Sequence, residues 1–372
     1  SPEIQEKPII SKPMTLNQPT GSNFVDGLFS SPEIKSLISG KQGKEKIQSP
    51  QNKHTKEATI DSKQRTTPVY KEKEKEVVKK IRIYKESTKP GFTGIETKKN
   101  NQDIAIIYPN FNGEKDHFFF SVCDGHGILG HDVSRYIKGT LPVNLEQEIK
   151  NKNLHVFESD YKKVCSSIED MFNLTNYNLN NSTIETEFSG STCVSMILSP
   201  TKLITANIGD SRAVMGKLVD GKWVAKDLTR DHKPGDRDEL MRIKMHGGRI
   251  EPYRDENNEF IGPERVWLKN QDIPGLAMSR SFGDRVAASV GCISTPEIFQ
   301  FSFVEEDKFM IIASDGVWEF ITSDECVDII KDYYLANDIG GCCNYILKES
   351  SQRWIQEEEV IDDTTMIIIF FD

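Results

Sequence analysis

The sequence VCDGHG at positions 122–127 is the stretch from which the fold and the chemistry of this chain are first inferred. It ends the apolar run Phe118–Cys123, which has the length and composition of a strand, and its glycines favour a sharp turn. The turn places a carboxylate (Asp124), a backbone carbonyl (Gly125) and an imidazole (His126) close together. Oxygen ligands of this kind suit hard divalent cations, and an imidazole transfers protons near neutral pH.

Three further aspartates repeat this arrangement. Asp210, Asp284 and Asp315 each follow a short apolar run that ends in small residues. One tetrapeptide of this type is compatible with chance, and aspartate after glycine commonly serves a turn. The repetition nevertheless favours a carboxylate-rich metal centre over a set of unrelated turns.

Composition indicates a soluble protein with one large domain and an additional segment. Of its 372 residues, 37% are hydrophobic and 28% charged, and the longest apolar run, Met366–Phe371, is far below the ~20 residues that span a bilayer. No signal peptide is apparent, although the chain begins at Ser1 and its native start is therefore unknown. The seven cysteines are scattered through apolar segments, which favours reduced thiols over disulfides or a zinc site. We expect an intracellular location, cytoplasmic or nuclear.

The chain changes character near residue 78. Residues 1–77 are rich in Lys, Ser, Gln, Pro and Asn, which predicts a weakly ordered basic tail or linker before a catalytic domain at 78–372. Residues 1–85 carry a net charge of +7, whereas the whole chain carries −10. The acidic body argues against nucleic-acid binding. The tail is either a passive leader or, because it repeats Ser-Pro-Glu-Ile, a segment that binds a partner.

Short strand-like runs follow one another along the body, and helical patterns separate them. Helical spacing of apolar residues occurs in Tyr161–Leu174, Pro234–Met245 and Ser323–Tyr334, and Thr322–Glu325 has the form of a capping box. Successive strands favour antiparallel sheets covered by helices over a parallel α/β sheet. The predicted strands are Val78–Tyr84, Asp103–Tyr108, Phe118–Cys123, Thr192–Leu198, Leu203–Ile208, Arg212–Gly216, Trp223–Leu228, Phe309–Ala313 and Thr365–Phe371.

Seven motifs occur in order along this body. They are NNQD (100–103), FSGST (188–192), ANIGDSRA (206–213), DHKP (231–234), PGLAMSRSFGD (274–284), IIASDGVW (311–318) and IDDTT (361–365). Together with VCDGHG they make the chain resemble the metal-dependent serine/threonine protein phosphatases of type 2C from about residue 78 to its end.

This resemblance implies an α+β fold, a four-layer αββα sandwich in which two antiparallel β-sheets are flanked by helices. It implies hydrolysis of phosphoserine and phosphothreonine in proteins by water activated at a centre of two Mg²⁺ or Mn²⁺ ions, with a third, weaker ion also considered. The expected partners are phosphoprotein substrates, and we expect a monomer. The alternatives are a catalytically weak scaffold or binding protein of the same fold, and a hydrolase of small phosphate esters.

The resemblance also implies roles for individual residues. Asp124 matches the carboxylate that bridges two metal ions, and Gly125 matches a glycine whose carbonyl completes one coordination shell. The remaining implied metal ligands are Asp315 and Asp362 for the first ion, Asp103 for the second, and Asp210 and Asp284 for the third. The last two are equally compatible with bracing hairpins.

Two further residues are implied to act on the substrate. His126 matches the proposed general acid, and Lys98 lies where many relatives place an arginine that binds the substrate phosphate. A lysine there offers a point charge instead of a two-pronged donor. Gln102 stands where many relatives have a glutamate. Asp362 fits the ligand pattern better than Asp363.

Overall fold

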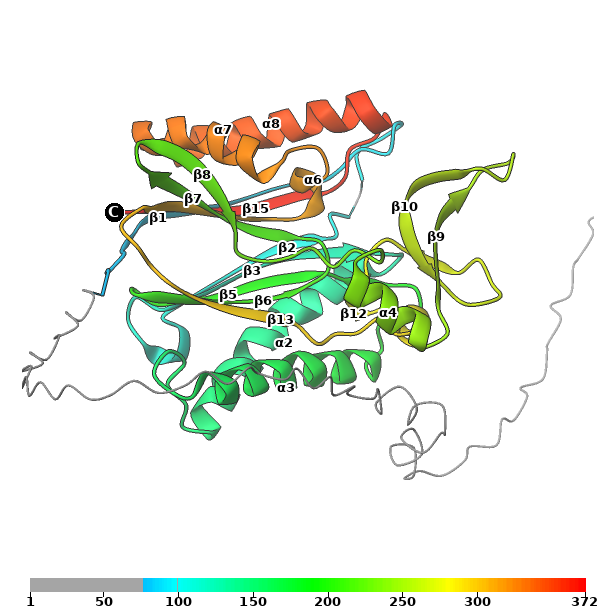
Figure 1. Cartoon of the computed structure of the whole chain (residues 1–372), viewed down its shortest axis with the longest axis horizontal. Coiled ribbons are helices and arrows are strands. Elements are labelled where there is room, and N and C mark those ends of the chain that lie inside the picture. Colours follow the sequence, from blue (N-terminus) through cyan, green and yellow to red (C-terminus); the bar gives the residue numbers. More distant parts are fainter. Residues whose placement is uncertain (1–75, 99) are drawn as a thin grey trace, which may run out of the picture. The chain divides into compact units, whose positions relative to one another are not determined.

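The structure is a computed structural model that describes residues 76–98 and 100–372 (Figure 1). Apart from its last two residues, the predicted tail 1–77 lies outside the described residues. Its weak order, its role in binding a partner and the domain boundary at residue 78 therefore stay predictions.

Two antiparallel sheets lie face to face in the described chain. The order of the first sheet is β1 (Ile81–Lys89), β15 (Thr364–Phe371), β14 (Asp307–Ala313), β7 (Arg212–Val219) and β8 (Lys222–Asp227). The order of the second is β12 (Phe282–Gly283), β4 (Gly190–Ser191), β3 (Phe118–His126), β5 (Cys193–Leu198), β6 (Lys202–Ile208) and β13 (Glu297–Ser302), with β2 (Asp103–Pro109) also paired to β3.

Helices cover the outer face of each sheet. Helices α2 (Gly130–Asn151) and α3 (Tyr161–Asn180) pack against the second sheet, and α7 (Ser323–Ala336) and α8 (Ile339–Glu358) pack against the first (Figure 1). The short elements are η1 (Phe111–Gly113), α5 (Arg285–Ala288) and α6 (Asp315–Trp318). The predicted four-layer αββα sandwich is confirmed.

Strand β15 explains why the sandwich has three apolar layers. All eight of its residues are buried. Met366, Ile368 and Phe370 belong to the cluster under α7 and α8, whereas the alternate residues Ile367, Ile369 and Phe371 belong to the cluster between the sheets. Because successive side chains of a strand point to opposite faces, a strand covered on both faces is apolar throughout.

The helix predictions were partly correct. Helix α7 begins after the predicted capping box: the Thr322 hydroxyl accepts a hydrogen bond from the Glu325 N–H, and the Glu325 carboxylate accepts one from the Thr322 N–H. Helices α2 and α8 were not predicted. Gly139 and Pro142 interrupt the helical pattern of α2. Helix α8 has two glycines in its first turn, and apolar and polar residues mix along it. Both helices therefore depend on packing against a sheet.

A third sheet of three strands was also missed. It consists of β9 (Arg249–Arg254), β10 (Phe260–Trp267) and β11 (Pro274–Leu276), and α4 (Arg237–Met245) lies beside it. The hairpin β9–β10 extends beyond the sandwich at the end where α8 finishes (Figure 1). Tyr253, Phe260 and Ile261 are exposed, so the alternation that reveals a half-buried strand is absent.

The structure also bears on the cysteines and on membrane spans. The seven cysteines, all within the described residues, form no disulfide, and six of them are buried. In residues 76–98 and 100–372, no helix is both long and apolar enough to cross a bilayer.

The packed layer between the sheets gives a stability prediction. Ile312 of β14 is fully buried there, so Ile312→Ala should lower the free energy of unfolding by about 2–5 kcal/mol through lost burial and the cavity left behind. Denaturant unfolding followed by circular dichroism measures this change. Ile83→Ala, at a side chain that is 38% exposed, is the control and should cost much less. Equal losses would mean that this layer is not tightly packed.

Candidate metal centre

Four carboxylates meet where the two sheets end. Asp103 and Asp124 are directly paired residues of β2 and β3 in the second sheet. Asp315 opens α6 just after β14, and Asp362 lies just before β15, so both come from the first sheet. The charges of Asp103 and Asp315 act on the Asp124 carboxyl, and the charge of Asp362 acts on all three.

Their closeness changes the acidity of these groups. Burial, reinforced by the charges of Asp362 and Asp363, raises the pKa of Asp103 to about 7, although a hydrogen bond from Ser314 opposes the shift. Burial, followed by the charges of neighbouring aspartates, raises the pKa values of Asp124 and Asp315 well above the usual aspartate range. These carboxylates therefore repel one another unless protons or cations compensate their charge.

The donor set fits a hard divalent cation. Its side-chain ligands would all be oxygen atoms, as Mg²⁺ and Mn²⁺ prefer. Among the described residues, the buried Oδ1 atoms of Asp103, Asp210 and Asp315 have no hydrogen-bond partner, and a buried polar atom normally has one. In the same part of the chain, no group of three or more His, Cys, Asp or Glu side chains is arranged so that it could hold a metal ion as it stands. The residues suit cations in chemistry and burial, and their roles as ligands stay predictions.

The structure separates Asp362 from its neighbour Asp363. The Asp363 carboxylate is buried and accepts hydrogen bonds from the backbone N–H groups of Gly91 (2.7 Å) and Gln102 (2.9 Å). It therefore fastens two loops together. Asp362 remains 37% exposed and lines a cavity, so it is the better placed of the two to bind a ligand.

Gly125 and Gln102 lie in a tightly packed turn beside Asp124. A Cβ atom at Gly125 would meet the carbonyl oxygen of Gly130 and, at 2.7 Å, that of Gln102, so only glycine fits. The Gln102 side chain donates to the Gly127 carbonyl at 2.6 Å. Gln102 thus braces the turn that carries His126, a role that the sequence did not suggest. The predicted coordination by the Gly125 carbonyl stays a prediction.

Lys98 contacts the candidate metal ligands. Its ammonium donates to Asp362 Oδ1 at 2.5 Å and lies 3.8 Å from Asp363 Oδ2. Burial alone would lower the pKa of Lys98, but the charge and hydrogen bond of Asp362 raise it above its usual value. The lysine therefore stays charged beside the centre, and its predicted contact with a substrate phosphate is untested.

His126 is held by Asp284. Its Nε2 atom lies 2.6 Å from Asp284 Oδ2, which also accepts from the Ser281 hydroxyl at 2.6 Å. Burial alone would lower the pKa of His126, but the Asp284 carboxylate raises it above its usual value. A Cβ atom at Gly190 would collide with Asp284 Oδ2, so the glycine makes room for this pair. In the structure Asp284 is the hydrogen-bond partner of His126, and its predicted role as a ligand of a third, weaker ion stays a prediction.

Asp210 faces the centre from the opposite side. It is 3% exposed, and its Oδ2 atom accepts from the Lys233 ammonium at 2.6 Å. Its charge helps to raise the pKa of Asp315. Burial alone would lower the pKa of Lys233, but the charge and the hydrogen bond of Asp210 raise it above its usual value. Asp210 is therefore close to the four carboxylates, as a ligand of a third ion would be, while its second oxygen is bound to a lysine.

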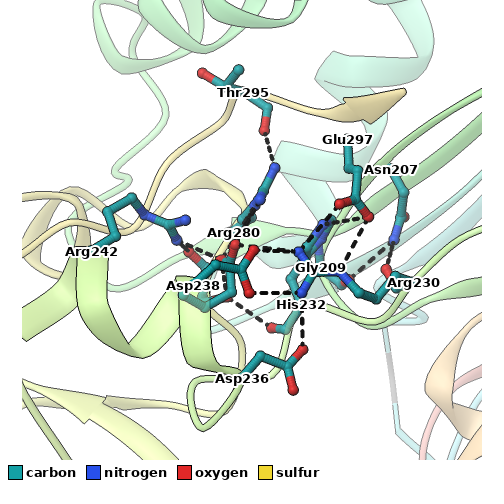
Figure 2. Close-up of polar contacts among 12 residues, drawn as sticks. Asn207, Gly209, Arg230, His232, Asp236, Asp238, Arg242, Arg280, Thr295 and Glu297 are labelled. Atoms are coloured by element: carbon teal, nitrogen blue, oxygen red, sulfur yellow. Dashed lines mark hydrogen bonds and ion pairs between the residues drawn. The ribbon is translucent and has the colours of Figure 1, made fainter. Parts of the chain in front are cut away.

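An ion-pair network that includes Arg242 and Arg280 surrounds His232 (Figure 2). The fully buried Glu239 accepts from Arg242 and Arg280 at 2.6 Å each and from the Ser279 hydroxyl. Burial alone would raise the pKa of Glu239, but these hydrogen bonds lower it. Arg280 is therefore an internal ion-pair partner. The central role of Glu239 was missed, because it lies in a charged run that reads as a solvated helix face.

The same network fixes the loops that carry site residues. Buried His232 has its pKa lowered to about 3, first by burial and then by Arg280, so it is neutral. Its Nδ1 atom accepts from the N–H of Gly209, the residue before Asp210, at 3.1 Å. Its carbonyl accepts from the Ser279 N–H at 2.9 Å. The loops before Asp210, Lys233 and Ser281 are thereby held together.

A cavity of about 870 Å³ opens over this centre. Asp210, Asp315 and Asp362 line it, and so does the hairpin β9–β10, through Tyr253 and residues 261–265. The ends of α6 and α8 form the opposite wall, through Glu319 and Glu358. The volume lies within the usual range for small-molecule and cofactor sites.

Comparisons with known proteins agree on one family. Residues 91–355 match the model of the family described as Protein phosphatase 2C. The chain is 40% identical over 238 residues to Probable protein phosphatase 2C 72 of Arabidopsis thaliana, covering 63% of this chain and 70% of the relative. It is 31% identical over 301 residues to Probable protein phosphatase 2C 35 of the same plant, covering 77% and 83%.

A solved structure supports the fold. The crystal structure of serine-threonine phosphatase 2C from Toxoplasma gondii superposes with a TM-score of 0.63 at 20% identity, covering 80% of this chain and 98% of that one. At this identity the likeness concerns the fold alone.

The pair of His126 and Asp284 gives a titration prediction. In Asp284→Asn the raising charge is lost and burial dominates, so the pKa of His126 should fall below its ordinary value of about 6.5. Nuclear magnetic resonance titration of the metal-free protein, with the signal assigned through His126→Gln, measures it. Ser281→Ala removes a hydrogen bond but no charge and should shift the pKa less. An unchanged pKa in Asp284→Asn would contradict the pairing.

The crowded carboxylates give a stability prediction. Folding raises the pKa values of these carboxylates. Their contribution to the stability of the metal-free protein should therefore be complete below about pH 4 and should be lost as pH rises toward 7 and above. At pH 7 with chelator, Asp124→Asn should be more stable than the parent by about 1 kcal/mol or more. With Mn²⁺ the order should reverse, because the parent gains binding energy.

Chemical denaturation in chelator and in Mn²⁺ measures both effects. Asp332→Asn, at an exposed position of α7, is the control and should behave as the parent does. An equal gain from Mn²⁺ in the parent and in Asp124→Asn would remove Asp124 from the metal site.

Proposed function

Because this chain belongs to the protein phosphatase 2C family, we propose that it hydrolyses phosphoserine and phosphothreonine in proteins by means of water activated at a centre of two Mg²⁺ or Mn²⁺ ions. The observation that carries the metal dependence is the buried group formed by Asp103, Asp124 and Asp315. Burial, followed by the charges of neighbouring aspartates, raises the pKa values of all three, and buried Oδ1 atoms of Asp103 and Asp315 lack partners among the described residues.

In this proposal Asp124 would help to hold both ions, Asp315 and Asp362 would help to hold the first, and Asp103 the second, with Gly125 adding its carbonyl. Two cations held there would offset the charge of a phosphate and lower the pKa of a bound water. The carboxylates would hold the cations in place, and solvent would be the nucleophile, so no cysteine is needed in that role. Asp210 is left for a third, weaker ion.

His126 would supply the proton that the leaving serine or threonine oxygen needs. The Asp284 carboxylate at 2.6 Å keeps the imidazole charged to higher pH than usual and fixes one of its nitrogens. The acid form is present below the raised pKa, so this contribution is complete at lower pH and is lost as pH rises through it. The proton donor and its orienting carboxylate come from two loops that Gly190 allows to touch.

Lys98 would bind the phosphate through its ammonium once cations have taken over the charge of Asp362. Its raised pKa keeps it positive for that role. In this proposal the protein is a monomer, and its partners are phosphoprotein substrates. The tail 1–77 is a candidate segment for binding them. Seven unbridged cysteines support an intracellular location.

A comparison of two substrates tests this function. With Mn²⁺ the full chain should dephosphorylate a phosphothreonine peptide, and chelator should stop turnover. His126→Gln should slow the peptide reaction by about 10²–10⁴-fold and affect 4-nitrophenyl phosphate less, because its leaving group needs little help from an acid. His155→Gln, at an exposed position, is the control.

Absence of metal-dependent turnover by the parent would refute the proposed function. Equal losses on both substrates would instead make His126 a group that positions water.

A further inference from the structure

We infer that the cavity over the candidate centre selects phosphoproteins with a basic side chain close in sequence to the phosphorylated residue, through the carboxylates of Glu264, Glu319 and Glu358. This inference rests on the proposed function and specifies its substrate class. It is carried by the charges that line the cavity and by the partners that each of them has.

The cavity is strongly acidic. Seven carboxylates and two cationic side chains line its 870 Å³. Three of the carboxylates, Asp210, Asp315 and Asp362, form the floor at the candidate centre. The floor is built to receive a charged ligand, because Asp210 is 3% exposed and its buried Oδ1 atom lacks a partner within the described residues. Bound cations would offset the charge of this floor.

The rim keeps its charge. Glu264 comes from β10, Glu319 directly follows α6, and Glu358 ends α8, so three separate elements place a carboxylate around the opening. All three residues are exposed, and none takes part in an ion pair within the part of the chain that the structure describes. Figure 1 shows that the hairpin of Glu264 projects at the end of the sandwich where α6 lies and α8 finishes.

The cations of the cavity are already bound to the protein. Lys233 donates to Asp210 at 2.6 Å. Arg265 donates to the Gly275 carbonyl at 2.8 Å, and its guanidinium lies over the Tyr253 ring, 4.6 Å from the centroid. The seventh carboxylate, Asp236, is 3.5 Å from Arg230. Arg265 keeps its positive charge, because neither a carbonyl nor a ring neutralises it. The rim therefore presents three carboxylates without an ion-pair partner against this one cation among the described residues.

The walls between these charges suit the stems of lysine and arginine. Tyr253, Ile261 and Pro263 line one side, and Phe320 and Trp354 line the other. Long basic side chains lay their methylene groups along apolar surface while the charged end meets a carboxylate. A peptide with acidic residues beside the phosphate would be repelled by the same rim, so the charges discriminate as well as attract.

The test uses three phosphothreonine peptides that differ only in the residues flanking the phosphothreonine, which are arginine, glutamine or glutamate. For the full chain with Mn²⁺, kcat/KM should fall in that order. The ratio of the arginine to the glutamine peptide should be about 5–10-fold, as expected for a few exposed charge pairs, and should shrink in high salt.

The variant Glu264→Gln/Glu319→Gln/Glu358→Gln should bring this ratio close to one. The ratio comes from a single enzyme preparation, so a loss of activity common to both peptides cancels. The control is Glu86→Gln/Glu114→Gln/Glu305→Gln, which removes three exposed glutamates that do not line the cavity and should keep the ratio of the parent.

Equal turnover of the three peptides by the parent would overturn the inference while leaving the proposed function intact. The inference would also fail if the rim variant kept the preference, or if the control variant lost it to the same extent. Failure of the parent to hydrolyse any of the peptides with Mn²⁺ would refute the proposed function, and this inference with it.

Discussion

Mutual repulsion among buried carboxylates is the constraint on which the site of this protein depends. Asp103, Asp124 and Asp315 come from strand ends of two different sheets, and folding brings them within reach of one another away from bulk water. Such a group is costly unless protons or cations offset its charge. The fold must therefore supply the energy that holds these residues together, and the three apolar layers of the sandwich do so.

The two sheets have different parts in this arrangement. The second sheet supplies Asp103 and Asp124 as paired residues of β2 and β3, so their separation is fixed by strand register. The first sheet supplies Asp315 and Asp362 at the ends of its central strands, β14 and β15, which are buried on both faces. Strands thus set the positions of these four carboxylates, and loops supply the groups around them.

Those loops are held by the ion-pair network around Glu239, in which opposite charges compensate one another. Glu239 is compensated by Arg242 and Arg280, and the network fastens the loops that lead to Asp210, Lys233 and Ser281 (Figure 2). The charges of this network are compensated within the protein, whereas the carboxylates of the candidate metal centre crowd together and repel one another. This contrast distinguishes a cluster that holds the structure from one that is suited to bind, and sequence composition alone does not reveal it.

The sequence by itself determined the family, the four-layer sandwich and the identity of the aspartates that gather at the centre, because short motifs at strand ends keep their order and spacing. Tertiary structure alone decided the partners: Asp284 with His126, Lys98 with Asp362, and Glu239 at the heart of a buried network. It also decided that the hairpin β9–β10 and the end of α8 share one cavity. The physical reason is that these contacts join residues far apart in the chain, and burial and electrostatic environment depend on what packs around a residue.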